Sequence, residues 1–300
     1  MILLTLLACE ANQLSQPWLV DRTRILGVQA EPAEPQPGDL VRFSSLAVDP
    51  EAGGISSVTW LGCLVEDSNA FGCSPDFARI EELLAVDVES LPPLEQLQWF
   101  KDLQAAGMLG VEPDFPPSLT VPEDLLDDLD EDQKLEGKNY FLTISAMPAG
   151  LDLENAEDIT DETLGELGNK RLPVSLGETP NHNPAITGVL LEGEFELADG
   201  DTITITRGQT YTLEPLVTPE SIEDYVYVNS EGVAEDRTEE PYFTYYTTGG
   251  AFDQYIALHP HFDLQYTAPV DPSSEPETIW MVIRDRRGGM AWSTVHVVVE

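Results

Sequence analysis

Short apolar segments with alternating character recur along the chain, separated by turns rich in proline and glycine. Leu26, Val28 and Ala30 alternate with polar or small neighbours, and a later segment, 58–61, carries Trp60 as a large aromatic anchor. Short strands at this spacing, with such turns between them, are typical of β-sandwiches. The first part of the chain therefore predicts a sandwich.

The apolar spacing then changes to a helical period. Helix-start signals occur three times, at Ser74–Pro75, at Pro93 and as a capping box at 120–123, with Gly107 as the stop of the second helix. Strand character returns at 140–144, and acidic residues are concentrated between Glu112 and Glu166. We therefore expect a helical, acidic insertion of about residues 74–138 within the first sandwich.

The clearest domain boundary is the polar stretch 178–184, which contains two prolines and two asparagines. Beyond it the pattern is β throughout, and 279–283 is apolar on both faces, as a central strand should be. We predict a signal and tether over 1–23, a first sandwich over 24–180 and a second over 181–300. The predicted strands of the second sandwich are 186–191, 202–206, 225–228, 242–246, 279–283 and 290–299.

Composition agrees with two folded domains and restricts the partners. The chain has 300 residues, 42% of them hydrophobic, but 55 acidic against 14 basic residues give a formal charge of −41. A surface this negative repels nucleic acid and anionic lipid head groups and attracts cations and basic surfaces. The sequence therefore predicts no nucleic-acid partner. We interpret the charge mainly as a source of solubility in salty surroundings.

The start of the chain resembles a bacterial lipobox, in which a peptidase cuts before a cysteine that carries diacylglycerol. Leu6, Ala8 and Cys9 have the required spacing, although residues 1–8 include no Lys or Arg, so we expect the true start codon to lie upstream. The alternative is a buried strand with a free cysteine, but the polar stretch 10–16 favours a tether. No run approaches the roughly 20 apolar residues that span a bilayer. We therefore expect Cys9 to anchor the protein, outside the cytoplasm, to a bacterial envelope membrane, with the outer membrane as the expected one.

Assigning Cys9 to lipid leaves Cys63 and Cys73 as a pair in an oxidising compartment. The turn-forming residues between them allow the two sulfurs to meet, and so small a ring would add about 2–3 kcal/mol. We predict a Cys63–Cys73 disulfide. Two reduced structural cysteines are the alternative.

The end of the chain resembles the immunoglobulin (Ig)-like repeats, of the PKD and cadherin-like groups, that occur in bacterial surface proteins. The matching parts are 266–269, 279–285, 288–289 and 295–299. In the first domain, 136–140 resembles the tyrosine corner of Ig folds, with glutamate in place of aspartate and no cysteine after Tyr140. The chain as a whole resembles bacterial cell-envelope lipoproteins with Ig-like domains. This resemblance implies a mainly β fold of two tandem Ig-like sandwiches and display at a surface, and it carries over no activity.

Three segments have some features of metal sites. Asp128, Asp130 and Asp132 imitate the start of a calcium loop, but Gln133 replaces its glycine and Asn139 its glutamate. The stretch 178–183 has some likeness to calcium-binding cadherin linkers, and His259, His261 and Asp263 form a zinc candidate. A solvated acidic helix end and surface turns explain the same residues. We assign no metal or cofactor, with calcium as the alternative.

The sequence contains no nucleophile elbow, phosphate loop, zincin motif or dinucleotide fingerprint, so we predict no enzymatic activity and no catalytic residue. We expect a lipid-anchored scaffold or binding module whose partner is another envelope protein or polymer. Two alternatives stay open, a calcium-stiffened adhesin and a carbohydrate-binding or carbohydrate-processing protein. The second would use exposed aromatic residues among Tyr225, Tyr227, Tyr242, Phe243, Tyr245, Tyr246, Phe252 and Tyr255.

Overall fold

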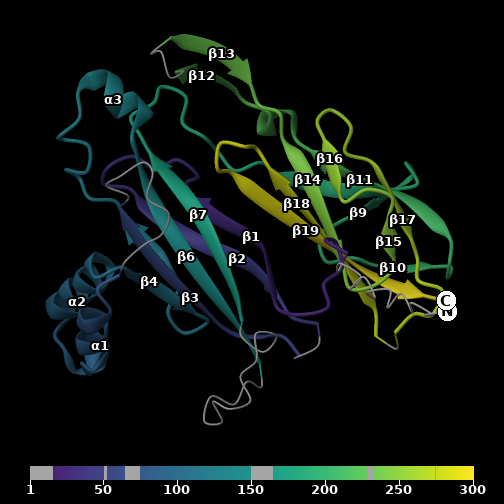
Figure 1. The fold of residues 1–300 in the computed structure, drawn as a ribbon, viewed down its shortest axis with the longest axis horizontal. Helices are drawn as coiled ribbons and strands as arrows, with labels where there is room; N and C mark the ends of the chain where they lie inside the picture. Colours follow the sequence, from purple (N-terminus) through teal and green to yellow (C-terminus); the bar gives the residue numbers. More distant parts are fainter. Residues whose placement is uncertain (1–15, 51–52, 65–74, 150–164, 229–232, 274) are drawn as a thin grey trace, which may run out of the picture.

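The computed structural model describes residues 16–50, 53–64, 75–149, 165–228, 233–273 and 275–300. The described chain is mainly β. Its strands form two groups that follow one another along the long axis of the molecule, as Figure 1 shows. The group within residues 24–174 is called the N-terminal strand group, and the group within residues 186–299 is called the C-terminal strand group.

The N-terminal strand group contains two antiparallel sheets. One contains β1 (Arg24–Glu31), β2 (Leu40–Val48) and β5 (Ser118–Thr120), in the order β1-β2-β5. The other contains β3 (Ile55–Leu64), β4 (Met108–Glu112), β6 (Lys138–Pro148) and β7 (Glu166–Val174), in the order β4-β3-β6-β7.

These two sheets share one apolar core. Trp60 of β3 is fully buried, and its ring lies 5.5 Å from the ring of Phe43 on β2. Alternate residues of β6, including Leu142 and Ile144, are also fully buried, as the period of two in a strand requires. Trp60 is therefore the aromatic anchor that the sequence predicts.

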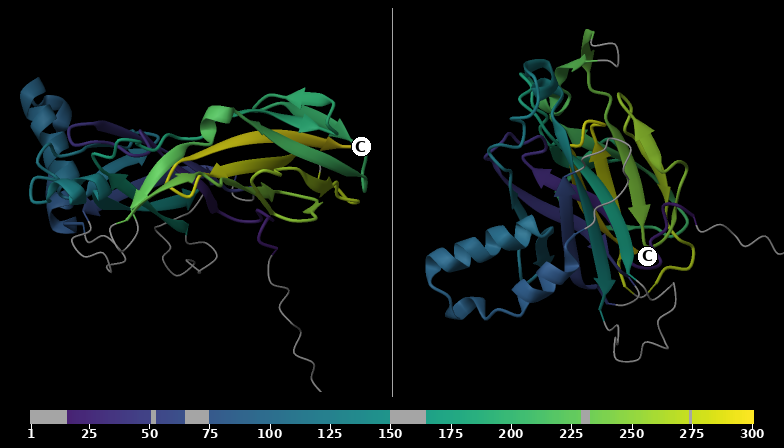
Figure 2. Two further views of the ribbon diagram at one scale, coloured as in Figure 1. Left: turned by 90° about the horizontal axis from the view of Figure 1, so that it is seen from above. Right: turned by 60° about the vertical axis from the view of Figure 1, so that its left-hand side comes forward.

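Two helices connect β3 to β4. They are α1 (Phe77–Leu84) and α2 (Pro93–Ala105), with a short 3-10 turn η1 (Val88–Ser90) between them. Asp76 caps α1 by accepting the Arg79 N–H, so the helix begins two residues later than Ser74–Pro75 predicts. Gly107 follows α2 with a φ of 99°, as predicted for a helix stop. Figure 2 shows this helix pair projecting from the sheets.

The third predicted helix lies elsewhere. Thr120 ends β5, and the following Val121 is fully buried in the N-terminal core. The capping box occurs at Asp130 and Gln133 instead and opens α3 (Glu131–Glu136). The prediction of a helix at 120–123 is wrong because strand pairing and burial outweigh the local capping signal. The stretch 74–138 is consequently only partly helical, since it includes β4 and β5.

The C-terminal strand group contains two five-stranded sheets. The first has the order β10-β19-β18-β14-β16 and contains β10 (Thr202–Ile205), β14 (Tyr242–Thr247), β16 (Ile256–Leu258), β18 (Glu277–Arg284) and β19 (Met290–Val299). The second has the order β15-β17-β11-β8-β9 and contains β8 (Ile186–Leu191), β9 (Phe195–Leu197), β11 (Thr210–Val217), β15 (Ala251–Phe252) and β17 (Leu264–Thr267).

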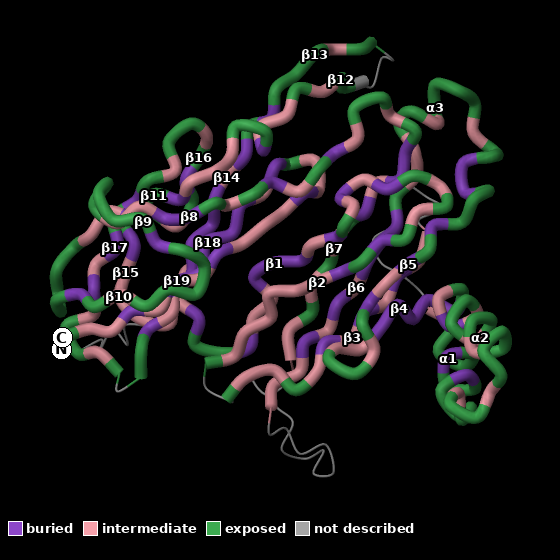
Figure 3. The backbone as a smooth tube through the Cα atoms, turned by 180° about the vertical axis from the view of Figure 1, so that it is seen from behind, coloured by how far each residue is buried: buried purple, intermediate pink, exposed green. Residues whose placement is uncertain are grey.

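A second apolar core lies between these sheets. Met281 and Ile283 of β18 are fully buried and belong to the same cluster as Leu213 of β11 and Tyr266 of β17. Strand β18 lies between β14 and β19, which is the central position predicted from its apolar pattern. Figure 3 shows buried positions concentrated along the sheets of both groups.

A two-stranded sheet stands apart from both cores. Its strands are β12 (Asp224–Val228) and β13 (Ala234–Thr238), and a 3-10 turn, η3 (Pro219–Ser221), precedes them. Most of the described residues of this hairpin are exposed (Figure 3). In Figure 1 it lies beside α3, above the junction of the two strand groups.

The two strand groups contact each other through a third apolar cluster, the junction cluster. Leu26 of β1 packs there with Trp280 and Val282 of β18, and Val20 lies against Thr247 of β14. Residues 18–20, which the sequence assigns to the tether, thus pack on the C-terminal strand group. The junction is built from segments more than 200 residues apart in sequence.

Candidate functional site

The residues predicted for lipidation and the disulfide lie mostly outside the described residues. Cys9 and Cys73 both do. Cys63 lies near the end of β3, opposite Phe141 of β6. The lipid anchor and the disulfide therefore stay predictions. Within the described residues, no helix has the length and apolarity needed to cross a membrane.

The acidic triplet Asp128, Asp130 and Asp132 lies at the start of α3, where two of its members make local contacts. Lys138 donates a hydrogen bond to Asp128 at 2.6 Å, and this bond lowers the pKa of Asp128. Asp130 caps α3, and Asp132 lies in the first turn of that helix. Across the described part of the chain, no group of three His, Cys, Asp or Glu residues is placed to hold a metal ion, and this includes His259 and His261.

The linker 178–183 fastens the two strand groups together. Asn181 donates to Asp285 at 2.9 Å, and the His182 ring lies 2.7 Å from Glu223. Asn183 donates to the Ala30 carbonyl at 2.7 Å. The polar residues that suggest a cadherin-like linker are therefore engaged in contacts across the junction.

Half of the eight aromatic residues considered for carbohydrate binding are buried. Phe243, Tyr245, Tyr246 and Phe252 are buried, so no continuous exposed aromatic face exists on β14 and β15. Tyr227 on the hairpin is exposed, and Tyr225 beside it is partly buried. These two line a groove of about 750 Å³ with Leu135, Glu136 and Glu178.

The turn between β18 and β19 is the polar centre of the junction. The buried Asp285 carboxylate accepts hydrogen bonds from the backbone N–H groups of Arg287, Gly288 and Gly289. Burial raises the pKa of Asp285, while these bonds and the one from Asn181 act in the opposite direction. A Cβ at position 289 would lie 2.0 Å from the Asp285 carboxylate, so the turn requires glycine there.

Arg287 extends from this turn into a group of three glutamates. Its guanidinium lies 3.1 Å from Glu239, 3.2 Å from Glu223 and 3.4 Å from Glu34. It also lies 4.4 Å from the centre of the Tyr225 ring. The side chain is only 14% exposed and that of Glu239 only 1%. One cation thus holds the linker region, the hairpin and the N-terminal strand group together.

Burial disfavours the charged forms of two groups at the junction. It raises the pKa of Glu239 to about 7, against the opposing effect of Arg287, and it lowers the pKa of Lys170 on β7 to about 8. Because the pKa of Glu239 is higher in the folded protein than its ordinary value, this group lowers the free energy of unfolding as pH rises from about 4.5 to 7. Because the pKa of Lys170 is lower in the folded protein than its ordinary value, this group increases the free energy of unfolding as pH rises from about 8 to 10.5.

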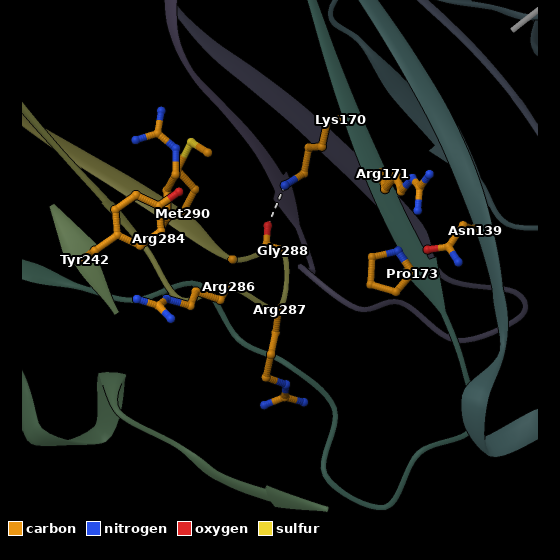
Figure 4. Close-up of a pocket in the computed structure, with 11 residues that line it drawn as sticks. Asn139, Lys170, Arg171, Pro173, Tyr242, Arg284, Arg286, Arg287, Gly288 and Met290 are labelled. Atoms are coloured by element: carbon orange, nitrogen blue, oxygen red, sulfur yellow. Dashed lines mark hydrogen bonds between the residues drawn. The ribbon is translucent and has the colours of Figure 1, made fainter. Parts of the chain in front are cut away.

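Lys170 is placed by the strand that carries it. It lies on the same face of β7 as the buried Leu172 and Val174, at the edge of the sheet, and donates a hydrogen bond to the Gly288 carbonyl. This contact, shown in Figure 4, joins β7 to the turn between β18 and β19. The sequence interpretation passes over Lys170, Glu239 and Arg287. A signal for Arg287 was present in the sequence, because three of the 14 basic residues lie within 284–287.

The helix pair presents a different kind of surface. One face packs on the sheet through Ile80, Leu83 and Leu103, which are buried with Met108. Several large apolar side chains of this segment are nevertheless exposed, and Leu94 is 82% exposed. The other large apolar side chains exposed on this segment are Phe77, Leu84, Val86, Leu97 and Phe100.

Comparison with known proteins adds a limited amount. No protein-family model and no curated protein matches the chain. Among solved structures, the two tandem V-type regions of the chitin-binding protein VCBP3 are 12% identical, with a TM-score of 0.29 and coverage of 91% of this chain and 99% of that one. A chimeric titin Z1Z2 is 13% identical, with a TM-score of 0.22 and coverage of 94% and 98%.

A third similar structure is a nucleoside hydrolase-related hypothetical protein from Saccharophagus degradans. It is 12% identical with a TM-score of 0.27, and the match covers 51% of this chain and 39% of that one. The chain therefore spans about two fifths of that protein. At these TM-scores none of the three similarities supports an argument about function.

Proposed function

We propose that the protein is a non-enzymatic scaffold or binding module of a bacterial envelope, held at a membrane by lipid on Cys9. In this proposal the two strand groups are tandem Ig-like sandwiches, and the helix pair is an insertion in the first that binds a partner. The observation that carries it is the exposed apolar surface of α1 and α2, on a part of the chain that projects from the sheets (Figure 2). An apolar patch of this kind favours a protein partner.

The charge around this surface indicates the chemistry of the partner. Residues 76–106 contain seven acidic and two basic side chains. A complementary partner therefore presents an apolar face ringed by Lys or Arg, since potentials of opposite sign steer and orient association. The contacts of the junction support the same function, because they hold the strand group that carries the helix pair against the other strand group.

We expect photo-cross-linking of the membrane-anchored protein to show that this surface binds a partner. A photoreactive residue in place of Leu94 should yield a discrete protein adduct. The same residue in place of Phe195, which is 61% exposed on β9 of the other strand group, should not. The adduct should weaken when Leu97→Glu is added, because a charge within the apolar face must be desolvated on binding. Equal adducts from positions 94 and 195, or adducts unaffected by Leu97→Glu, would contradict the proposal.

The lipid anchor predicts a complete change of fractionation. Cys9→Ser removes the only thiol that the lipobox offers, so the protein should move from the membrane to the aqueous fraction and lose acyl labelling. Fractionation and radiolabelled palmitate incorporation measure both effects, with Cys63→Ser as the matched control that keeps its anchor. Membrane association of the parent without acyl incorporation would refute the anchor.

A carbohydrate-binding function is a second candidate, supported by the groove beneath the hairpin. Tyr227 offers an exposed ring there, and Glu136 and Glu178 offer hydrogen-bond acceptors, which is a combination that suits sugars. A glycan array read by tryptophan fluorescence tests it, with Tyr227→Ala as the variant that should lose any signal. Silence across the array would remove this candidate.

A further inference from the structure

The hairpin of β12 and β13 forms one wall of the groove of about 750 Å³ described above. The end of α3, with Leu135 and Glu136, and the linker residues 177–179 form the opposite wall. Figure 1 shows the hairpin beside α3, and Figure 3 shows the same arrangement from behind. Ligand sites usually measure about 300–1,000 Å³. The groove is therefore large enough to hold part of another molecule.

The groove runs along one edge of β12. Three consecutive residues of this strand line it, Tyr225, Val226 and Tyr227, whereas β13 contributes only Ala234. Successive side chains of a strand point to opposite faces, so a groove that contacts three in a row lies beside the strand and not over one face. Strand β13 occupies one edge of β12. The groove therefore borders the other edge.

The backbone of β12 has hydrogen-bonding groups that β13 does not use. The Glu239 N–H donates to the Glu223 carbonyl at 2.9 Å, which makes residues 223 and 239 a hydrogen-bonded pair in the register of the hairpin. Such pairs alternate with non-hydrogen-bonded pairs, whose N–H and carbonyl groups point away from the partner strand. Val226, opposite Asp236, belongs to the second kind. Within the described residues no other strand pairs with this edge, so its donor and acceptor face the groove unused.

The side chains around this edge are apolar and acidic. Val226 and Leu135 are large apolar residues that are exposed. Glu136 and Glu178 are also exposed, and neither forms an ion pair with a described residue. Arg287 is the one cation among the lining residues, and the three glutamates of the junction already surround it. The groove therefore places uncompensated negative charge next to a free strand edge.

These features fit an extended, basic peptide segment. A peptide that adds a strand to a free edge gains affinity from main-chain hydrogen bonds, and its side chains provide specificity. Lysine or arginine on that peptide would complement the two glutamates. This chain does not supply such a segment from outside the described residues, because all 14 of its Lys and Arg residues lie within them. The occupant is therefore a segment of another protein.

A sugar, which is the occupant of the second candidate function, fits the groove less well. Sugars stack on the faces of aromatic rings, and here Arg237 lies over the Tyr227 ring at 3.8 Å from its centre. Arg287 lies over the Tyr225 ring in the same way, at 4.4 Å. One face of each ring is thus covered. A sugar also makes no use of the free backbone edge, which a peptide does.

We propose that this groove binds an extended peptide segment containing Lys or Arg, which pairs with β12 as an added strand and places its cations near Glu136 and Glu178. A two-stranded hairpin is only marginally stable alone, and a third strand would stabilise it. The site is separate from the helix pair and from Cys9. The proposal therefore does not depend on the partner or the anchor proposed above.

Fluorescence anisotropy tests the site with a labelled peptide of alternating lysine and valine, added to the full chain carrying Cys9→Ser. We expect saturable one-to-one binding that weakens as salt is raised, because exposed charges are screened. Two further peptides carry N-methyl groups on the lysines or on the valines, which removes half of the backbone donors and keeps every charge. Only every second N–H of an added strand faces β12, so one of the two should bind at least tenfold more weakly.

Variants of the groove test the same interaction from the side of the protein. Val226→Pro removes the N–H that points away from β13 and keeps the pairing within the hairpin, so the unfolding midpoint should match that of the parent while peptide affinity falls at least tenfold. Glu136→Gln combined with Glu178→Gln should cause a several-fold loss. Glu194→Gln is the matched control, because Glu194 is exposed between β8 and β9, outside the groove, and affinity should not change.

Three results would overturn the proposal. The first is the absence of saturable binding of the lysine peptide. The second is equal affinity of the parent for the unmodified peptide and for both N-methylated peptides, since attraction between charges alone would then explain binding. The third is a glycan that binds the parent and is lost in Tyr227→Ala, while the lysine peptide does not bind, since the groove would then be a sugar site.

Discussion

Replacing Arg287 with alanine is expected to lower the free energy of unfolding by about 3–5 kcal/mol, as is typical when one partner of a buried ion pair is removed. The change leaves Glu239, whose side chain is 1% exposed, and Glu34, which is 15% exposed, without their shared cation. Urea unfolding followed by tryptophan fluorescence measures the loss through the transition midpoint and slope. The loss should be smaller at pH 5 than at pH 8, because the pKa of Glu239 is already raised to about 7 and protonation removes its charge.

Arg237→Ala is the matched control for this prediction. Arg237 also pairs with a glutamate, Glu235, at 2.7 Å, but the two side chains are 43% and 41% exposed. Exposed pairs contribute about 1 kcal/mol or less. If Arg287→Ala and Arg237→Ala cost the same, the junction network contributes no more than a surface pair, and the prediction is wrong.

Replacing Trp60 with alanine should also cost about 3–5 kcal/mol, through a cavity in the N-terminal core. The ring is fully buried, packs on Phe43, and donates its Nε1–H to the Glu112 carboxylate at 2.9 Å. Neighbouring β-sheet backbone restricts collapse into the vacated space. Chemical denaturation again measures the difference.

Trp60→Phe separates the two contributions to that loss. It keeps a ring against Phe43 and removes the hydrogen bond to Glu112, so we expect a cost of about 1–2 kcal/mol, near that of one hydrogen bond to a charged group. A loss equal to that of Trp60→Ala would mean that the hydrogen bond, rather than burial of the ring, dominates.

Local patterns predict the strongly periodic elements well. The strand predicted at 186–191 coincides with β8, and the one predicted at 290–299 coincides with β19. The helical pattern from Pro93 and its stop at Gly107 agree with α2. In each of these segments apolar spacing, turn residues and burial all favour the same structure, so no tertiary contact has to override the local preference.

Elements with a weak local pattern were missed or misplaced. Strand β4 is short and pairs with β3, which lies far earlier in the sequence. Strands β13 and β16 pair with the nearby strands β12 and β14, but both are short and β13 is polar, so neither has a clear apolar pattern. The capping signal at 120–123 failed because β5 pairs with β2 and Val121 enters the core. Propensity is a weak prior, and such tertiary contacts outweigh it.

The sequence alone determined that this protein is mainly β and that its chain contains helices between residues 74 and 106. That nucleic acid is not a partner stays a prediction from the charge. The sequence also supplied the motif for a lipid anchor at Cys9. Only the tertiary structure brought Lys170 to the turn at 285–289 and placed Arg287 among three glutamates. The physical reason is separation along the chain: those contacts join residues up to 253 positions apart, and no local period or spacing encodes such a pairing.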